Sequence, residues 1–438
     1  MSSLNMRAVA APAYNAAGLK VRNITNEQKL LRMTMAHMLW ENQFYVDGAK
    51  SNEILGALVK KVKPDFAAAV AERARNEFKL RHVPLMIMRE LARKGNLRAE
   101  ALNAVIQRPD EMGEFLSIYW KEGKTPISNQ VKRGLAASIT KFNEYSLAKW
   151  DKNSAGVSVR DVLFLTHAKP VNDAQAELFK RIANKQLQTP DTWETELSAG
   201  ADKCATFTRL MNEKKLGALA FLRNLRNMVQ SGVDDILIRS YGANLNVDKV
   251  LPFRFIAAAR IVPQFEDMLE QMMFKALEKH EKLPGKTVLV IDVSGSMFGA
   301  KVSAKSDLDR FDAAAALAVL CREICEQVEI FSFSYDAKRV APRRGFALVE
   351  AIRNSQGHGG TQLGQSLRTI YSLVGKHDRC IVFTDEGTYD RVEAPKCKHG
   401  YVLNVAAYEN GINHQDWMTI SGFSEAVLDY IQMFENLD

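Results

Sequence analysis

Side-chain oxygens recur at every second position of the short stretch "DVSGSM". Asp292, Ser294 and Ser296 directly follow an apolar run, and Gly295 and Gly299 loosen the backbone around them. Carboxylate and hydroxyl oxygens are the ligand atoms that Mg²⁺ and Mn²⁺ prefer in proteins. The stretch therefore predicts a site for a hard divalent cation at the end of a buried strand.

Two further loops carry matching oxygen ligands. The loop "QGHGGTQLG" supplies Thr361 behind three glycines, and Asp385 and Glu386 follow the apolar run "CIVFT". Ligands bind outside the carboxyl ends of parallel strands, where such loops meet. We expect one cation to be held by five side chains: Asp292, Ser294, Ser296, Thr361 and Asp385. Because only two of these are carboxylates, the cation would need another anionic oxygen from outside the chain.

Other chemistries fit these residues less well. A D-x-S-x-S stretch taken alone is also compatible with a strand-end turn whose serines cap the backbone. The nucleophile elbow G-x-S-x-G does not fit around Ser294 or Ser296, and a phosphotransferase would need a second carboxylate in place of Ser294. The eight histidines are dispersed, and we interpret His358, which lies nearest the predicted metal edge, as a loop residue. We therefore expect no catalytic residues and no enzyme activity.

Residues 286–438 contain the elements that must position these loops. Apolar strands ("TVLVIDVS", "VEIFSFS", "RCIVFTDE", "YVLNVAAY") alternate with helical stretches ("SDLDRFDAAAALAVLCREICEQ", "TQLGQSLRTIYSLVG", "SEAVLDYIQMFEN"). This alternation predicts a doubly wound parallel sheet covered by helices on both faces.

Residues 25–283 have a different pattern. Stretches such as "FAAAVAERARNEF" and "VPLMIMRELARKG" place apolar residues three and four positions apart, with short connections between them. This pattern predicts antiparallel helix pairs stacked into an α-solenoid of the HEAT or armadillo kind, although no clean repeat period is visible. The charged stretch "KHEKLPGK" marks the boundary to 286–438, and residues 1–24 are expected to be an N-terminal arm.

The net charge of +8 is unevenly distributed. Residues 286–438 contain 16 Lys and Arg against 20 Asp and Glu, whereas residues 1–285 contain 43 against 31. The basic surplus of the first part favours a polyanion as partner, with a merely lysine-rich helical surface as the alternative. Five scattered cysteines without metal-finger spacing indicate reduced thiols and a cytoplasmic protein. No apolar run is long enough for a membrane span, and the first residues do not resemble a secretory signal.

Three basic stretches of the first part could contact RNA. They are "KRGLAASITKFNEYSLAKW", "SVRDVLFLTHAKP" and "LGALAFLRNLRNM", and their candidate RNA-binding residues are Lys132, Arg133, Lys141, Lys149, Arg160, His167, Lys169, Arg223 and Arg226. Cations neutralise phosphates, and nearby aromatics such as Tyr145 and Trp150 can stack on unpaired bases. The alternatives are that the aromatics belong to the core, that His167 is a satisfied turn residue, and that Arg223 and Arg226 brace neighbouring helices.

The three metal-edge loops resemble a known site. "DVSGSM", the Gly-Gly-Thr loop and "FTDE" are similar to the metal-ion-dependent adhesion site of von Willebrand factor type A domains, and the resemblance covers residues 286–438. It implies that the same five side chains ligate the metal. In that family the site binds and does not catalyse, because an acidic group of a partner completes the coordination of the metal.

The complete chain resembles a second family. "VRDVLFLTHAKP", "LGALAFLRNLRNM" and "LPFRFIAAAR", followed by a type A domain, are similar to the TROVE-module family of the Ro autoantigen and its bacterial relatives. The resemblance implies helical repeats closed into a ring by the type A domain. It implies that small noncoding Y RNA binds the outer basic surface and that the central hole takes single-stranded 3′ ends of defective RNAs. By motif match, Lys141 and His167 lie where the family contacts Y RNA.

These patterns predict an RNA-binding scaffold in noncoding-RNA quality control or processing. Its expected partners are small noncoding RNA, single-stranded 3′ RNA ends and an RNA-processing exoribonuclease. The alternative is a metal-dependent protein-interaction scaffold that grips an acidic residue of a partner without RNA. The basic first part favours RNA. We expect Mg²⁺ or Mn²⁺ as cofactor, a monomer, and no contact with membranes.

Overall fold

The computed structural model describes residues 13–14, 20–21, 25–36, 48–151, 156–248, 250–278, 280–300, 308–385, 388–405, 416–421 and 426–436. The chain folds into two compact units. We call residues 29–35 and 48–249 the helical unit, and we call the unit centred on residues 250–438 the sheet unit. None of the helices in the described residues combines the length and apolarity needed to cross a bilayer.

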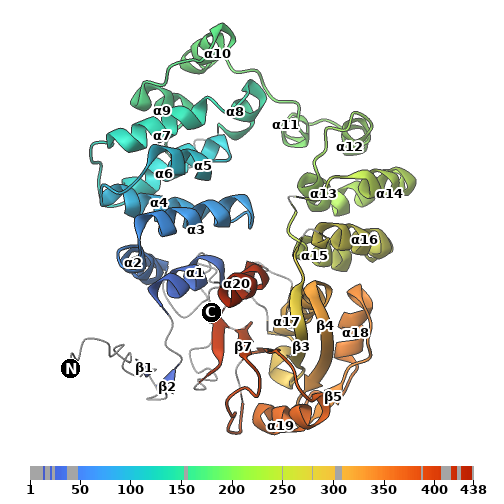
Figure 1. Cartoon of the computed structure of the whole chain (residues 1–438). Helices are drawn as coiled ribbons and strands as arrows, with labels where there is room; N and C mark the ends of the chain where they lie inside the picture. Colours follow the sequence, from blue (N-terminus) through green and yellow to red (C-terminus); the bar gives the residue numbers. More distant parts are fainter. Residues whose placement is uncertain are drawn as a thin grey trace, which may run out of the picture. The chain divides into compact units, whose positions relative to one another are not determined.

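The helical unit consists of successive short helices (Figure 1). They are most of α1 (Asn26–Ala36), then α2 (Gly48–Val59), α3 (Pro64–Asn76), α4 (His82–Arg93), α5 (Ala99–Val105), α6 (Pro109–Tyr119), α7 (Asn129–Ile139), α8 (Glu144–Trp150), α9 (Val159–Thr166), α10 (Asp173–Ala183), α11 (Trp193–Ser198), α12 (Lys203–Asn212), α13 (Ala218–Gln230) and α14 (Asp235–Asn244). Helices two places apart in the sequence also pack together: α3 on α5, α4 on α6 and α5 on α7. This is the stacking that the apolar periodicity predicts for a solenoid.

Local sequence explains where these helices begin and pack. Side chains of Ser128, Asn143 and Asn172 accept hydrogen bonds from the first turns of α7, α8 and α10, as N-cap residues do. Apolar residues four apart on α7 are fully buried. At Gly134 an added Cβ would lie only 2.9 Å from the Ala99 carbonyl oxygen, so glycine lets α5 and α7 approach closely.

The sheet unit contains a six-stranded sheet. Its strands are β3 (Leu283–Asp292), β4 (Cys325–Phe333), β5 (Ala337–Arg339), β6 (Arg379–Thr384), β7 (His399–Asn404) and β8 (Met418–Ser421), in the spatial order β5-β4-β3-β6-β7-β8. All neighbours are parallel except β4 and β5, which are antiparallel. Its helices are α15 (Phe253–Ile261), α16 (Glu266–Leu277), α17 (Arg310–Ile324), α18 (Gly345–Arg353), α19 (Leu363–Val374) and α20 (Ala426–Glu435).

The predicted parallel sheet is confirmed, with differences at its edges. The helix expected over residues 306–327 ends at Ile324, and Cys325 begins β4, because the β-branched and aromatic run that follows extends the strand backwards to pair with Leu283. The short elements α18, β5 and β8 were not predicted. In the helical unit, α5 ends at Val105, and Pro109 begins α6 as a first-turn proline.

The two helices before the sheet pack on the sheet unit. The Arg260 guanidinium of α15 pairs with Asp312 of α17, and the Phe346 N–H donates to Glu270 Oε1 of α16 at 2.7 Å. The compact unit therefore begins at Val250, ahead of the boundary that "KHEKLPGK" suggests. Of the expected N-terminal arm, the described residues form a two-stranded antiparallel pair, Ala13–Tyr14 with Lys20–Val21.

Candidate metal edge and nucleic-acid surface

The strand register brings the first and third predicted loops together. Asp292 is the last residue of β3, and its neighbour Ile291 pairs with Phe383 of β6. Asp292 therefore lies beside Thr384, and Asp385 follows at the same edge of the sheet. The Thr384 hydroxyl donates to Asp292 Oδ2 at 2.6 Å, and the Ser294 N–H donates to Oδ1 at 2.8 Å.

Asp292 is fully buried at this edge. Burial raises the pKa of its carboxyl group to about 7, and the negative charge of nearby Asp385 acts in the same direction. The two hydrogen bonds from Ser294 and Thr384 only partly offset this effect. A cation at this edge would supply the positive charge that the buried carboxylate lacks.

The glycine loop packs against the "DVSGSM" loop. The Gly295 N–H donates to the Gly359 carbonyl at 3.1 Å, and the hydroxyls of Ser294 and Ser296 are 3.3 Å apart. An added Cβ at Gly359 or Gly360 would lie within 2.1 Å or 2.6 Å of the Tyr335 ring, so both positions require glycine.

Thr361 joins the second loop to the third. It is 5% exposed, and its carbonyl accepts a hydrogen bond from the Tyr389 N–H at 3.0 Å. Ser294 and Asp385 are also buried, whereas Ser296 is exposed. The five predicted ligand residues are thus brought to one edge by three connected loops, as the sequence predicts; Glu386 lies outside the described residues.

The donor set suits a hard cation. Two carboxylates and three hydroxyls match the oxygen-rich chemistry of Mg²⁺ and Mn²⁺. In the part of the chain that the structure describes, no group of three or more His, Cys, Asp or Glu could hold a metal ion, so the edge has no resemblance to a zinc site. His358 is used as a brace: its Nδ1 lies 2.9 Å from the Val293 carbonyl, and its ring lies against Phe298. This agrees with its interpretation as a loop residue.

One basic residue at this edge was not predicted. Arg310, the first residue of α17, donates from Nη1 to Asp385 Oδ2 at 3.0 Å and to the Ser296 carbonyl at 3.4 Å. It therefore connects the first loop to the third. The sequence places Arg310 18 residues after Asp292, inside a predicted helix, and its proximity to Asp385 depends on where that helix starts.

In the helical unit, Lys141 is engaged within the protein. Its ammonium group donates to the carbonyls of Asn103 and Ile106 at the C-terminal end of α5, where a cation is favourable. Partial burial lowers the pKa of Lys141 to about 8, although the residue as a whole is exposed. These contacts favour a structural role for this residue over direct contact with RNA.

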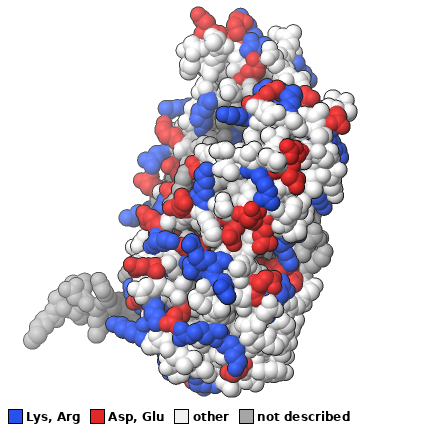
Figure 2. Space-filling model, turned by 90° about the vertical axis from the view of Figure 1, so that its right-hand side faces the viewer, with Lys and Arg blue, Asp and Glu red and all other residues white. Residues whose placement is uncertain are grey.

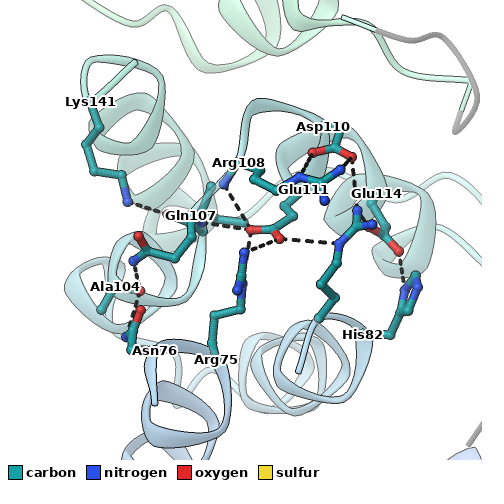
Figure 3. Close-up of polar contacts among 12 residues, drawn as sticks. Arg75, Asn76, His82, Ala104, Gln107, Arg108, Asp110, Glu111, Glu114 and Lys141 are labelled. Atoms are coloured by element: carbon teal, nitrogen blue, oxygen red, sulfur yellow. Dashed lines mark hydrogen bonds and ion pairs between the residues drawn. The ribbon is translucent and has the colours of Figure 1, made fainter. Parts of the chain in front are cut away.

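Lys141 borders a larger ion network around Glu111 (Figure 3). Glu111 is fully buried and accepts hydrogen bonds from Arg75 Nη2 at 2.6 Å, from the Gln107 N–H at 2.8 Å and from the Arg108 N–H at 3.1 Å. These contacts tie α3 to the start of α6. The network therefore has a structural role at the contact between these two helices.

Other candidate RNA residues divide into engaged and exposed groups. Arg160 Nε donates to the Ala183 carbonyl at 2.7 Å, and its guanidinium lies 5.0 Å from the centre of the Phe164 ring. The ammonium of Lys149 lies 5.6 Å from the Tyr145 ring and 5.7 Å from the Trp150 ring. The exposed group comprises Arg133, His167, Lys169, Arg223 and Arg226, while Lys132 is half-buried.

Arginines without a partner are rare in the helical unit. Within its described residues, only Arg133, Arg223 and Arg226 have a guanidinium with no hydrogen bond, ion pair or ring contact. Arg223 and Arg226 lie three residues apart on the exposed face of α13, beside Leu219, which is 45% exposed. They do not brace neighbouring helices, so this alternative is wrong for both. Their donors are available to an anion from outside.

The predicted aromatic residues are only partly available for stacking. Trp150 is half-buried under Arg108, whose guanidinium lies 3.6 Å from the centre of its ring. Tyr145 is 45% exposed. Phe164, which is 51% exposed and lies beside Arg160, was not among the predicted residues. His167 is the C-cap residue of α9, with φ 51°, and it is exposed.

Charge on the face shown in Figure 2 is mixed. Lys and Arg side chains alternate with Asp and Glu over this face and do not form one continuous basic field. The uneven net charge of the sequence therefore does not by itself locate an RNA surface. Basic side chains without a partner inside the protein indicate an RNA surface more specifically than net charge does.

Comparisons with known proteins agree with the fold. Residues 180–289 match the TROVE domain, and residues 287–387 match the von Willebrand factor type A domain. A stretch of 111 residues, 24% of this chain, is 28% identical to telomerase protein component 1 of Rattus norvegicus and a stretch of the same length 27% identical to that of Mus musculus. The matched stretch spans only 4% of the length of these relatives.

A solved structure has the same fold over nearly the whole chain. The crystal structure of Deinococcus radiodurans RO (RSR) protein aligns with a TM-score of 0.68 and covers 94% of this chain and 99% of that chain, at 20% identity. The TROVE and type A resemblances that the motifs suggested are thus confirmed. The TROVE match extends across α15 and α16, the helices that pack on α17.

Proposed function

Because this chain joins a TROVE segment to a von Willebrand factor type A domain, we propose that it is an RNA-binding scaffold. The observation that carries this proposal is the pair Arg223 and Arg226, two guanidinium groups without internal partners on one exposed helix face. Arginine donors match phosphate geometry and also stack on bases. The described residues of the helical unit pair nearly all their other arginines, so these two guanidinium groups are available to an external anion.

The proposed ligands are small noncoding, Y-like RNA and single-stranded 3′ ends of structured or misfolded RNA. This places the protein in noncoding-RNA quality control or processing, with an RNA-processing exoribonuclease as a protein partner. Exposed Tyr145 and Phe164 support stacking on unpaired bases in the helical unit.

The double substitution Arg223→Ala with Arg226→Ala tests the RNA surface. Loss of two phosphate or base contacts should weaken binding to a 3′-tailed RNA hairpin about tenfold or more, since each good contact is worth roughly 1–3 kcal/mol, and should lower the salt dependence. The matched control is Arg93→Ala with Arg209→Ala, which removes the same charge from arginines that pair with Glu122 and Asp191. Equal loss in both double variants would mean that charge alone, and not this face, carries binding.

We also propose that the sheet unit binds Mg²⁺ or Mn²⁺ through Asp292, Ser294, Ser296, Thr361 and Asp385, without catalysis. The buried and only partly compensated carboxyl group of Asp292 and the convergence of three oxygen-bearing loops support this proposal.

A second candidate function is a metal-dependent grip on an acidic residue of a protein partner. It is supported by two exposed aromatic side chains beside the edge: Tyr335 is 62% and Tyr389 is 86% exposed. Exposed tyrosines are frequent anchors of protein interfaces. If Tyr335→Ser with Tyr389→Ser abolishes capture of a purified protein partner while RNA affinity is unchanged, the two functions occupy separate surfaces.

A further inference from the structure

One positively charged side chain of the protein itself, that of Arg310, contacts the predicted metal edge. The Arg310 guanidinium lies 3.0 Å from Asp385 Oδ2 and 3.4 Å from the Ser296 carbonyl. Both partners belong to loops that supply predicted metal ligands. The Arg310 and Asp385 side chains are only 13% and 3% exposed, so water screens this ion pair little.

We propose that Arg310 is the resident counter-cation of the metal edge and competes with the divalent cation for Asp385. This inference rests on the proposed metal site. A carboxylate oxygen that accepts a charge-assisted hydrogen bond has less electron density to offer a metal, and a guanidinium beside the site repels a second positive charge. Metal binding must therefore release or weaken the bond between Arg310 and Asp385.

The start of α17 does not need the Arg310 side chain for its own stability. Asp309 caps the helix and forms a reciprocal capping box with Asp312. The Arg310 N–H is bonded to the Ala300 carbonyl at 3.0 Å, and the next residue, Phe311, stacks on Phe298 with ring centres 4.8 Å apart. The guanidinium can therefore be removed without unfolding the loop, and its role is the charge that it places at the edge.

Arg310→Gln tests this role in the full-length protein, with Mn²⁺ alone as the probe. We expect calorimetry to show about tenfold tighter Mn²⁺ binding than in the wild type, because the competing charge-assisted hydrogen bond is lost. Without metal, the variant should melt at a lower temperature than the wild type, since the buried carboxyl group of Asp385 loses its cation. Saturating Mn²⁺ should remove most of this difference.

Arg353→Gln is the matched control. Arg353 lies nearby on α18, 4.5 Å from the centre of the Phe311 ring, and pairs with Asp312, but it has no contact with the five predicted ligand residues. Its loss should leave Mn²⁺ affinity within about twofold of the wild type, because Arg353 is paired with Asp312 and not with Asp385. Equal tightening in both variants would reduce the effect to net charge and overturn the specific role of Arg310.

The outcomes separate this inference from the metal site itself. If the wild type binds Mn²⁺ and Asp292→Ala does not, the metal site stands. Unchanged or weaker binding in Arg310→Gln would then overturn the competition and leave Arg310 as a support for Asp385. If neither the wild type nor Arg310→Gln binds Mn²⁺, the metal site and the competition both fall.

Discussion

Glu111 in the helical unit and Asp292 in the sheet unit are both fully buried carboxyl groups, but their surroundings differ. Glu111 accepts hydrogen bonds from a guanidinium and from two backbone N–H groups, so its charge is matched inside the protein. Asp292 has a hydroxyl and one backbone N–H, and burial raises its pKa to about 7. A buried carboxylate points to a ligand only when the protein leaves its charge unmatched.

The same contrast applies to the cations. In the helical unit, Arg75 completes the site of Glu111, whereas Arg223 and Arg226 have no internal acceptor. Function is therefore expected where pairing is incomplete: at unpaired guanidinium groups for an anion, and at an undercompensated carboxylate for a cation.

Substitution of Glu111 should have the largest effect on stability. Glu111→Ala leaves the guanidinium of Arg75, whose side chain is 8% exposed, without its acceptor, and removal of one partner from a buried pair costs about 3–5 kcal/mol. Urea unfolding followed by circular dichroism would measure the loss. Glu122→Ala is the control, because Glu122 also pairs with arginines but its side chain is 60% exposed, so its loss should cost much less stability than the loss of Glu111. Equal losses would show that Glu111 is not the centre of the network.

Asp292→Ala should have the opposite combination of effects: a large effect on metal binding and a small effect on stability. It should abolish Mg²⁺ and Mn²⁺ binding in calorimetry while changing the free energy of unfolding by only about 1 kcal/mol, because the carboxyl group that it removes is poorly compensated. Asp336→Ala is a suitable control, since this aspartate lies in the loop after β4 and is half exposed. Retained metal binding in Asp292→Ala would contradict the metal site. A large loss of stability would instead mean that Asp292, like Glu111, has a mainly structural role.

His167 and Lys141 are both predicted to contact RNA, but the ammonium group of Lys141 is bonded within the protein. Their substitutions should therefore affect RNA binding differently. His167→Asn, which keeps a residue that tolerates positive φ, should weaken RNA binding several-fold, because the exposed ring of His167 can contact RNA. Lys141→Met should leave RNA affinity within about twofold, because the ammonium of Lys141 is bonded to carbonyls of α5. Filter binding of one tailed RNA hairpin would compare both variants. A larger effect from Lys141→Met would show that RNA displaces these carbonyl contacts.

The sequence predicts the parts of the sites that depend on one strand or one loop. Asp292 could be placed at a strand end because an uninterrupted apolar run precedes it, and Thr361 because glycines free the backbone before it. The carboxyl ends of parallel strands then bring these loops together without further information. The three-residue spacing of Arg223 and Arg226 likewise predicts that both lie on one helix face.

Sequence patterns could not predict contacts between side chains on different helices, strands or loops. Arg310 reaches Asp385 only because α17 starts beside the third loop, and Lys141 reaches the end of α5 only because α5 packs on α7. Neither contact has a signature in the spacing of residues. Short elements such as β5 were missed because three residues carry too little periodicity.

The last expected effect is the response of Lys141 to pH, which its exposure to solvent should reduce. Burial lowers its pKa to about 8 in the folded protein, against an ordinary value of 10.5 in the unfolded chain. Below pH 8 the residue is protonated in both states, and the cost of burying the charge is fully present. Between pH 8 and 10.5 the unfolded chain binds more protons at this residue than the folded protein does, so the contribution of Lys141 to stability should rise with pH.

Lys141→Met lacks this group, while the other titrating residues are common to both proteins. The free energy of unfolding of the wild type minus that of the variant should therefore increase from pH 8 to pH 10 in urea titrations. A difference that falls over this range would mean that the carbonyls of α5 stabilise the ammonium more than burial destabilises it, and Lys141 would then belong with the fully compensated charges of the helical unit.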